Sequence, residues 1–346
     1  MNGTILAGGY GDGIYVIAVN DGKLKHIATM PGCENPTYLA AYGERVYAVN
    51  ELQEGSKLTA IEYTSTRELR LINQVCIPGA GACHLSLDKS GKFLFAANYL
   101  SGDIISCSID KMGRVYKVLS HIVQEGTPSH CHCVIPSPGG EHLLAVNLGT
   151  DTVYSYKVNQ GVIAPRPHIF KTGKGQGPRH LVMDGEIAYL VTETGNMAIS
   201  LSYDKETGAL HGIQKEALLP RGCLQQSYAA GVALSPILLN TGEYAKRPHL
   251  QFSRRFMYVS NRGYNHLSVF AVDYGLLTRV GHYPSGGEWP RDLCISPEGD
   301  LIVVANQRSN NVACFRLDLK TGAVGEMVDS IKVPSPACVL YTANAN

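Results

Sequence analysis

The feature that most constrains the fold of this chain is a unit of about 50 residues that recurs along it. Its clearest copy, residues 82–110, reads ACHLSLDKSGKFLFAANYLSGDIISCSID, in which three apolar runs are separated by polar turns. Runs rich in Val, Ile, Phe and Tyr that end at Gly, Ser, Asp or Asn are typical of antiparallel strands in a meander. The repeated unit is therefore predicted to be a small sheet.

The last residue of the second apolar run can be compared between copies, and the spacing between these closing residues gives the period of the repeat. The spacings between successive closing residues are 48, 49, 45, 69 and 45, for Asn50, Asn98, Asn147, Thr192, Asn261 and Asn306. This period fits the blade of a propeller better than a helical solenoid. The chain ends complete each other, because 335–341 matches only a first strand and 5–19 matches a second and a third. We predict an all-β single domain over 1–346, a seven-bladed β-propeller with four-stranded antiparallel blades, the last closed by N- and C-terminal strands.

The composition narrows the class of partner. The formal net charge is +1 and only 17% of residues are charged, with no basic run of the kind that binds nucleic acid. No apolar run approaches the ~20 residues needed to span a membrane, and the N-terminus lacks the pattern of a secretory signal. The ten cysteines are irregularly spaced, as expected of buried thiols in a reduced compartment. We expect a cytoplasmic protein, monomeric or a small homo-oligomer, whose partner is a small molecule, with no nucleic acid and no membrane.

The 69-residue spacing holds an insertion of roughly 20 residues over the ordinary period. We place it in 212–247, at the junction between two blades. It is either a surface elaboration, since loops tolerate insertions, or a flap or wall beside the functional site.

Strand direction is expected to gather polar residues at one mouth of the central channel. In a meander, the start of the first strand and the end of the second lie at the same end of the sheet. The predicted strand-one starts are Tyr38, His84, His132, His180, His249, Asp292 and Cys338. The residues just before them include Arg179 and Arg291, and the residues after strand two are Tyr10, Glu51, Tyr99, Leu148, Glu193, Arg262 and Gln307. A concave mouth with convergent titratable groups is the default site hypothesis.

A structural role competes with a functional one at many of these positions. A histidine repeated at a strand start can bond to the neighbouring blade, and the recurring Asn residues can bond turns. The arginines and Glu193 differ, because no β-turn requires an arginine and a charge buried without a partner is costly. Functional roles are therefore favoured for Arg179, Glu193, Arg262 and Arg291.

The run His130-Cys131-His132-Cys133 contains residue types that bind zinc. Alternate residues of a strand point to opposite faces, so only two of the four could share a side, and no second cluster supplies further ligands by spacing. The chain also lacks the H-E-x-x-H, G-x-S-x-G, phosphate-loop and dinucleotide motifs. We therefore predict no metal and no cofactor.

Several segments together resemble the lactonase family of seven-bladed propellers. They are 35–39 (NPTYL), 84–88 (HLSLD), 177–182 (GPRHLV), 260–263 (SNRG), 289–292 (WPRD) and 305–307 (ANQ). The family includes bacterial propeller-type 6-phosphogluconolactonases and fungal carboxymuconate cyclases, and the resemblance spans essentially the whole chain. It implies metal-independent hydrolysis of a sugar lactone, most simply of 6-phosphogluconolactone to 6-phosphogluconate, a step of the pentose phosphate pathway.

The resemblance also implies site residues. The group proposed as active in the cyclase branch corresponds to His132, Arg179, Glu193 and Arg262, although Thr192 stands where the family usually has Asn. The residue types suit the chemistry: His132 could deprotonate water, with Glu193 orienting it or sharing the role, while an arginine stabilises the oxyanion. Arg291 and the remaining arginine could bind the phosphate. The predicted substrate-binding residues are Glu51, His84, Asn98, His180, Arg291 and Gln307.

Two alternatives stay open. The first is another lactone hydrolase or a muconate-type lactonising enzyme, which would recognise a carboxylate or hydroxyl groups instead of a phosphate. The second belongs to a different class, a non-catalytic propeller that serves as an interaction platform and exposes an apolar patch. Resemblance of fold alone does not decide among them.

Overall fold

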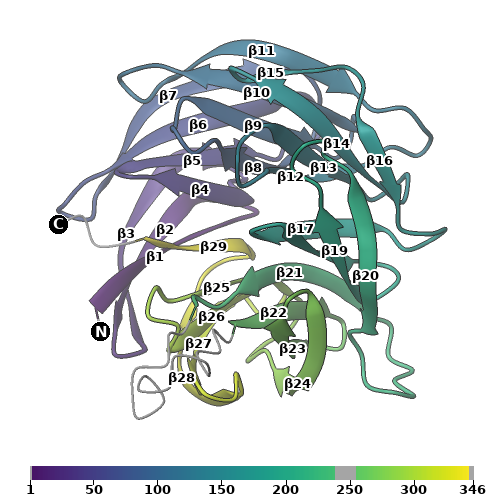
Figure 1. The fold of residues 1–346 in the computed structure, drawn as a ribbon. Coiled ribbons are helices and arrows are strands. Elements are labelled where there is room, and N and C mark those ends of the chain that lie inside the picture. Colours follow the sequence, from purple (N-terminus) through teal and green to yellow (C-terminus); the bar gives the residue numbers. More distant parts are fainter. Residues whose placement is uncertain (1, 238–254, 343–346) are drawn as a thin grey trace, which may run out of the picture.

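The computed structural model describes residues 2–237 and 255–342, and these form seven antiparallel sheets arranged in a ring (Figure 1). Six sheets have four strands, and in the seventh the outer strand is divided into two short pieces. The all-β fold and the seven-bladed propeller predicted from the repeat are confirmed.

Each blade contributes one strand to each of four concentric positions (Figure 1). The innermost strands are β4 (Tyr38–Tyr42), β8 (Ala82–Leu87), β12 (Cys131–Pro136), β17 (Pro178–Asp184), β21 (Tyr228–Leu234), β25 (Pro290–Ile295) and β29 (Pro336–Thr342). The second strands are β5 (Arg45–Asn50), β9 (Phe93–Asn98), β13 (His142–Asn147), β18 (Ile187–Thr192), β22 (Arg255–Arg262), β26 (Leu301–Asn306) and β1 (Asn2–Gly9).

The third strands are β6 (Ser56–Tyr63), β10 (Asp103–Ile109), β14 (Thr152–Asn159), β19 (Met197–Tyr203), β23 (His266–Asp273), β27 (Asn311–Leu317) and β2 (Asp12–Asn20). The outer strands are β7 (Leu69–Ile77), β11 (Val115–Val123), the divided pair β15 (Val162–Ile163) and β16 (His168–Lys171), β20 (Leu210–Ala217), β24 (Leu276–Pro284), β28 (Val324–Lys332) and β3 (Lys23–Glu34). We number the blades one to seven from β4 to β29.

The seventh blade is built from both ends of the chain, as predicted. Its innermost strand β29 pairs with β1 from Thr4↔Thr342 to Gly8↔Cys338, and β1 continues into β2 and β3. This pairing leaves no unpaired sheet edge at the junction between first and last strands.

The core lies between neighbouring blades rather than inside any one of them. Leu58 of blade one, for example, belongs to the same buried cluster as Leu85 and Leu94 of blade two. Both faces of the middle strands are covered in this way, which explains why all six residues of β13 are buried. Each blade therefore depends on its neighbours for its core, as in other repeat folds.

The structure corrects the assignment of blade five. Residues 212–247 include most of the ordinary outer strand β20 and all of the inner strand β21, which pairs with β22. The first strand of this blade is thus Tyr228–Leu234 and not the segment around His249, which lies outside the described residues. The sequence pattern was misleading because β21 (YAAGVAL) consists mainly of small apolar residues and has no histidine.

The additional chain of this blade consequently joins β21 to β22. It leaves β21 at Leu234 and enters β22 at Arg255, and both residues lie at the end of the blade opposite the predicted mouth. The prediction that the insertion sits at a blade junction, beside the mouth, is therefore wrong.

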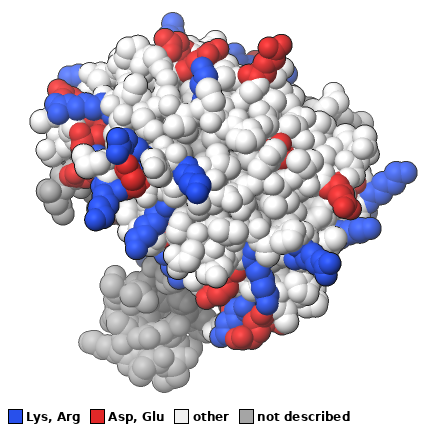
Figure 2. All heavy atoms as spheres, turned by 90° about the horizontal axis from the view of Figure 1, so that it is seen from above, with Lys and Arg blue, Asp and Glu red and all other residues white. Residues whose placement is uncertain are grey.

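Charged side chains of both signs are interspersed on the face seen in Figure 2, so this face carries no extended basic surface. In the described ranges, 2–237 and 255–342, the chain forms no apolar helix that is long enough to cross a membrane.

Candidate active site

A bulge at the start of the inner strands shapes the mouth of the channel. In blades two, three, four and six the ladder skips one residue near the strand start, and the skipped residues are Cys83, His132, Arg179 and Arg291. A bulge changes the direction of a side chain relative to a regular ladder, and bulges are frequent next to active sites. These four side chains therefore share one level around the ring.

The bulge also corrects the alignment of blade three. His132 was predicted to lie level with His84 and His180, but the residue at their level is Cys133, paired with Val146 as His180 is paired with Val191. His132 is level with Arg179 instead. The sequence did not reveal this because Cys131-His132 repeats the residue types of Cys83-His84 and was aligned with them, whereas the structure places His132 level with Cys83.

Three histidines and a tyrosine from four consecutive blades pack together beneath the mouth. The ring centroid of His180 lies 5.2 Å from that of His132 and 5.4 Å from that of His84. Tyr38 stacks at 4.1 Å on His84, and Tyr99 contacts His132 edge-on at 5.7 Å. The sequence prediction that these histidines converge is in agreement with this geometry.

The three imidazoles are neutral at physiological pH. Burial, followed by the charge of nearby Arg179, lowers the pKa of His132 and His180 well below 6.5 and the pKa of His84 to about 3. A buried positive charge beside a guanidinium is unfavourable, so each ring stays unprotonated and keeps one nitrogen lone pair.

The histidines differ in how their nitrogens are used. His84 accepts a hydrogen bond from the Val134 amide at its Nδ1, 3.4 Å away, and its Nε2 lies 3.5 Å from Cys133 Sγ. These contacts tie blade two to blade three and give His84 a structural role. His132 has a buried Nδ1 without a partner, so Nε2 is the nitrogen through which it can accept a proton from the mouth.

Glu193 joins two arginines across the junction of blades four and five. Its Oε2 lies 2.6 Å from Arg262 Nη2 and 3.0 Å from Arg179 Nε. The side chain of Arg179 is 2% exposed and that of Arg262 is 7% exposed, so the carboxylate compensates two nearly buried cations. This pairing replaces the predicted contact in which Glu193 would orient His132.

Arg179 retains unused donors. Its Nε lies within ion-pair distance of Glu193 without being aligned for a hydrogen bond, and its Nη1 has no partner. Unpaired N–H groups on a buried guanidinium are suited to an anion that arrives with a ligand.

Arg262 is held more completely. It donates from Nε to the carbonyl of Tyr228 at 3.4 Å and from Nη2 to the carbonyl of Ala229 at 3.2 Å. Its guanidinium carbon lies 5.9 Å from the ring centroid of Tyr228 and 5.6 Å from that of Trp289. Burial and the neighbouring Arg179 lower the pKa of Arg262 to about 10, although Glu193 opposes the shift.

A second chain of polar contacts crosses blades six, seven and one. Arg291 Nη2 donates to the Tyr10 hydroxyl at 2.8 Å, and this hydroxyl donates to Glu51 Oε1 at 2.9 Å. The guanidinium carbon of Arg291 also lies 5.2 Å from the Tyr10 ring centroid. Glu51 Oε2 is buried without a partner. Arg291 and Glu51, both predicted to bind substrate, are thus brought together at the mouth.

The amide of Asn98 is occupied by the scaffold. It donates to the Pro78 carbonyl at 2.9 Å and accepts from Ser56 Oγ at 2.9 Å, and the residue is fully buried. The geometry therefore favours a structural role over the predicted contact with substrate. Gln307 follows β26 at the mouth and is half-buried. Its backbone N–H donates a hydrogen bond to the backbone carbonyl of Trp289 at 3.1 Å.

Three aromatic residues at the mouth were not among the predicted site residues. Tyr10 and Trp289 stand in segments that the sequence comparison of blades does reveal, next to the closing residue of β1 and directly before Pro290. Tyr228 could not be found, because its strand was assigned to the wrong segment. In each case the aromatic ring contacts an arginine, a pairing that a single sequence does not disclose.

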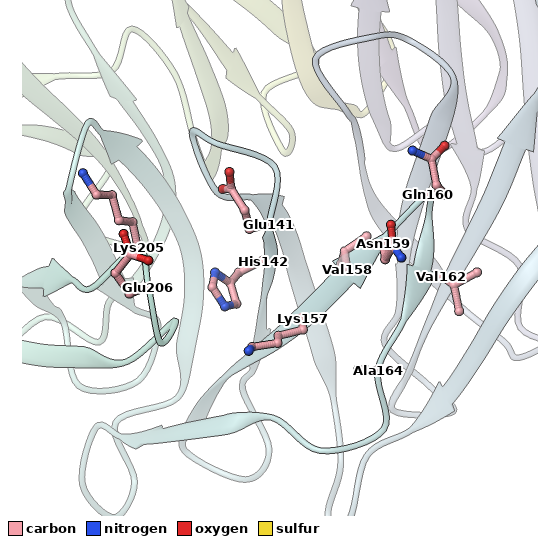
Figure 3. A pocket seen from close by; sticks show the side chains of 10 residues that line it. All are labelled: Glu141, His142, Lys157, Val158, Asn159, Gln160, Val162, Ala164, Lys205 and Glu206. Carbon is pink, nitrogen blue, oxygen red and sulfur yellow. The ribbon is translucent and has the colours of Figure 1, made fainter.

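A cleft of about 740 Å³ lies elsewhere, between blades three and four. Figure 3 shows its lining, in which His142 stands among the charged side chains Glu141, Lys157, Lys205 and Glu206. His142 begins β13, whereas the mouth residues follow the ends of the second strands, so this cleft opens at the opposite end of the sheet. It is therefore separate from the arginine and histidine cluster.

Among the residues that the structure describes, no three His, Cys, Asp or Glu side chains form a group that could hold a metal ion. In the run that suggested zinc, His130 stacks on Tyr99 at 4.4 Å, and Cys131 donates to Gln124 Oε1 at 3.2 Å. The side chains of His130 and Cys131 are thus used in packing and hydrogen bonding.

Comparison with known proteins places these features in context. The family described as the lactonase, seven-bladed β-propeller matches residues 3–341. A 6-phosphogluconolactonase of Bacillus subtilis (strain 168) is 28% identical over 98% of this chain and 97% of its own length. A 6-phosphogluconolactonase of Formosa agariphila is also 28% identical, over 93% of each chain.

Solved structures are also similar to this chain over nearly its whole length. A protein from Lactobacillus plantarum aligns with a TM-score of 0.87 and 28% identity, covering 99% of this chain and 100% of the other. The periplasmic gluconolactonase of Pseudomonas aeruginosa aligns with a TM-score of 0.84 and 27% identity, covering 99% of both chains. The similarity thus extends over the whole ring.

Proposed function

Because the chain belongs to the lactonase family of seven-bladed β-propellers, we propose that it hydrolyses a sugar lactone, and specifically 6-phosphogluconolactone to 6-phosphogluconate. The relatives named 6-phosphogluconolactonase, which match nearly the full chain, support this substrate. The ten cysteines are all free, as is usual in a reducing compartment, which supports a cytoplasmic location.

The main support for the proposal is a neutral histidine beside a cluster of arginines whose positive charge is only partly balanced by carboxylates. Arg179, Arg262 and Arg291 bring three positive charges to the mouth, and Glu193 and Glu51 bring two negative charges. The site therefore has an excess of positive charge and an unprotonated base at its wall. Hydrolysis of a lactone needs both, since a proton leaves water and a negative charge develops on the carbonyl oxygen.

We assign the steps to these groups as follows. His132 Nε2 takes a proton from a water whose oxygen bonds to the lactone carbonyl carbon, and the carbonyl electrons move to its oxygen. Arg179, with its unused N–H groups, stabilises this oxyanion, and Glu193 holds Arg179 and Arg262 in place. When the tetrahedral intermediate collapses, the ring C–O bond breaks and the imidazolium returns its proton to the leaving oxygen.

The low pKa of His132 has two consequences for this chemistry. It keeps the imidazole in the unprotonated form at neutral pH, and it also makes the imidazole a weaker base than a histidine in water. The guanidinium that lowers the pKa also stabilises the anion formed by the attack of water, so the same charge opposes the imidazolium and favours the intermediate. A substrate that neutralises part of the positive field would strengthen the base.

The pH profile of kcat/KM should reflect these shifts. Because a base acts only when unprotonated and burial lowers the pKa of His132, the acid limb should lie well below pH 6.5. Arg262 loses its charge as pH rises through its pKa of about 10, so a decline is expected there on the alkaline side. Initial rates, corrected for spontaneous lactone opening, test this expectation. A midpoint near pH 6.5 or above would argue against a buried histidine base.

Hydrolysis assays on matched lactones test the function itself. Lactone with and without a 6-phosphate, each in the presence and absence of EDTA, should show turnover of the phosphorylated lactone that does not depend on the chelator. Turnover of only the unphosphorylated lactone would instead indicate an activity like that named for the Pseudomonas aeruginosa neighbour. Hydrolysis of neither lactone would contradict the proposal.

A further inference from the structure

Arg308 lies at the rim of the mouth, against the only tryptophan of the chain. Its guanidinium carbon is 3.4 Å from the ring centroid of Trp289, the distance of direct stacking. The same indole is 5.6 Å from the guanidinium carbon of Arg262. One aromatic side chain therefore contacts both an inner arginine of the predicted active group and an outer arginine at the rim.

The position of Trp289 is fixed by its backbone. Its amide donates to Asn265 Oδ1 at 2.9 Å, and its carbonyl accepts from the Gln307 amide at 3.1 Å. The residue has a φ of 65°, in the left-handed region that bulky residues rarely adopt, so the surrounding bonds hold it there. A strained residue with satisfied backbone groups is a rigid support for the side chains that stack on it.

Arg308 is exposed, and among the described residues no carboxylate lies within ion-pair distance of its guanidinium. The other arginines of the mouth are engaged: Arg179 and Arg262 share Glu193, and Arg291 donates to Tyr10. Stacking orders a guanidinium without using its N–H groups, which lie in the plane of the group and remain free for an anion. Arg308 is thus ordered and positively charged, with N–H groups that no ion pair among the described residues uses.

We propose that Arg308, ordered by Trp289, binds the phosphate at the far end of the lactone substrate and is the residue that selects phosphorylated lactones. The inference rests on the proposed function, since it concerns the same site. The guanidinium carbons of Arg262 and Arg308 lie 5.6 Å and 3.4 Å from the Trp289 ring centroid, so their separation is at most the sum of these two distances. A six-carbon sugar phosphate can bridge such a separation. The reacting carbonyl then lies toward Arg179 and Arg262, and the phosphate lies at the solvent-exposed rim.

This assignment differs from the sequence prediction, which gave the phosphate to Arg291 and to whichever of Arg179 and Arg262 does not stabilise the oxyanion. Arg291 lies at the bulge level with Arg179 and His132, and its guanidinium is bonded to the Tyr10 hydroxyl. A phosphate is a large, strongly hydrated dianion, and the half-buried position of Arg291 would remove more of its water than the exposed rim does. A rim position keeps part of that hydration while offering a planar pair of donors.

The single tryptophan makes the proposal directly measurable, because fluorescence excited at the red edge of the protein absorption, where the tyrosines do not absorb, reports on Trp289 alone. The wild-type protein is titrated with 6-phosphogluconate, gluconate and inorganic phosphate. We expect 6-phosphogluconate to change the fluorescence at a concentration at least tenfold lower than gluconate. In Arg308→Ala, the apparent Kd for 6-phosphogluconate should rise about tenfold, and the ratio of kcat/KM between phosphorylated and unphosphorylated lactone should fall by a similar factor.

Arg70→Ala is the matched control, since Arg70 is an exposed arginine on the outer strand of blade one, paired with Glu68. It should leave the affinity unchanged, which separates a local effect from a general loss of positive charge. Trp289→Leu, with binding followed by calorimetry, should weaken 6-phosphogluconate as much as Arg308→Ala does, whereas Trp289→Phe should retain most of the affinity.

The outcomes distinguish the inference from the function on which it rests. If the wild type hydrolyses the phosphorylated lactone but Arg308→Ala binds 6-phosphogluconate as tightly and keeps the same substrate ratio, the role of Arg308 is overturned while the function stands. If the wild type neither binds 6-phosphogluconate nor hydrolyses either lactone, the proposed function fails and the inference fails with it.

Discussion

Replacing His132 by alanine is expected to lower kcat by about 10²–10⁴-fold, the range for loss of a general base. The reason is that His132 is the neutral imidazole level with Arg179 at the mouth, whereas His84 is occupied between two blades and His180 Nε2 is enclosed. His132→Gln should be equally impaired, because glutamine fills similar space and forms hydrogen bonds but cannot accept the proton. Steady-state kinetics on the proposed phosphorylated lactone measures the effect.

The control for this substitution is His211→Ala, which removes an exposed histidine on the outer strand β20 and should leave kcat unchanged. Because His132 is buried, the melting temperature of each variant must be recorded beside its rate. A well-folded His132→Gln protein with near-normal kcat would exclude His132 as the base.

Replacing Arg179 by methionine is expected to lower kcat/KM by about 10²–10³-fold, with most of the loss in kcat. An oxyanion exists only in the transition state and the intermediate, so a residue that binds it affects kcat more than KM. Methionine keeps most of the apolar volume of the arginine side chain and leaves Glu193 paired with Arg262. Arg179→Lys should recover only part of the activity, because an ammonium cannot reproduce the planar donors.

Chemical rescue provides a sharper control for Arg179. In Arg179→Ala, a truncated side chain leaves space at the site, and added guanidinium ion at low concentration should restore part of the rate. If KM rises while kcat stays normal, Arg179 binds the substrate in its ground state instead. The same conclusion follows if kcat and the affinity for product fall by equal factors.

The repeat predicted the architecture correctly because it reflects a long-range constraint that every blade obeys. Closing residues such as Asn98 recur because the same amide bridges the end of a second strand to the chain arriving from the previous blade. The predicted closure by both chain ends followed from the same rule, since an incomplete first copy and an incomplete last copy can only be one blade.

The errors arose where local geometry departed from the repeat. In blade three the bulge moves His132 by one level, and a bulge has no sequence signature in a strand of alternating His and Cys. In blade five the inner strand lacks a histidine, so the segment around His249 was taken as the first strand in its place. The partner of Glu193 was not predictable either, because ion pairs between blades depend on side-chain positions that only the assembled ring defines.

The pairing of β1 with β29 has a consequence for biosynthesis. Within the ring, β1 is made before β29 and must wait for it, with six blades made in between. Until then β1 is an uncovered template for other strands, and contacts of such large sequence separation form slowly. Since Tyr10 follows β1 directly and bonds to Arg291, the mouth is also assembled only at this final step. A nascent chain should therefore acquire protease resistance and ligand binding together, once β29 has paired with β1, rather than blade by blade.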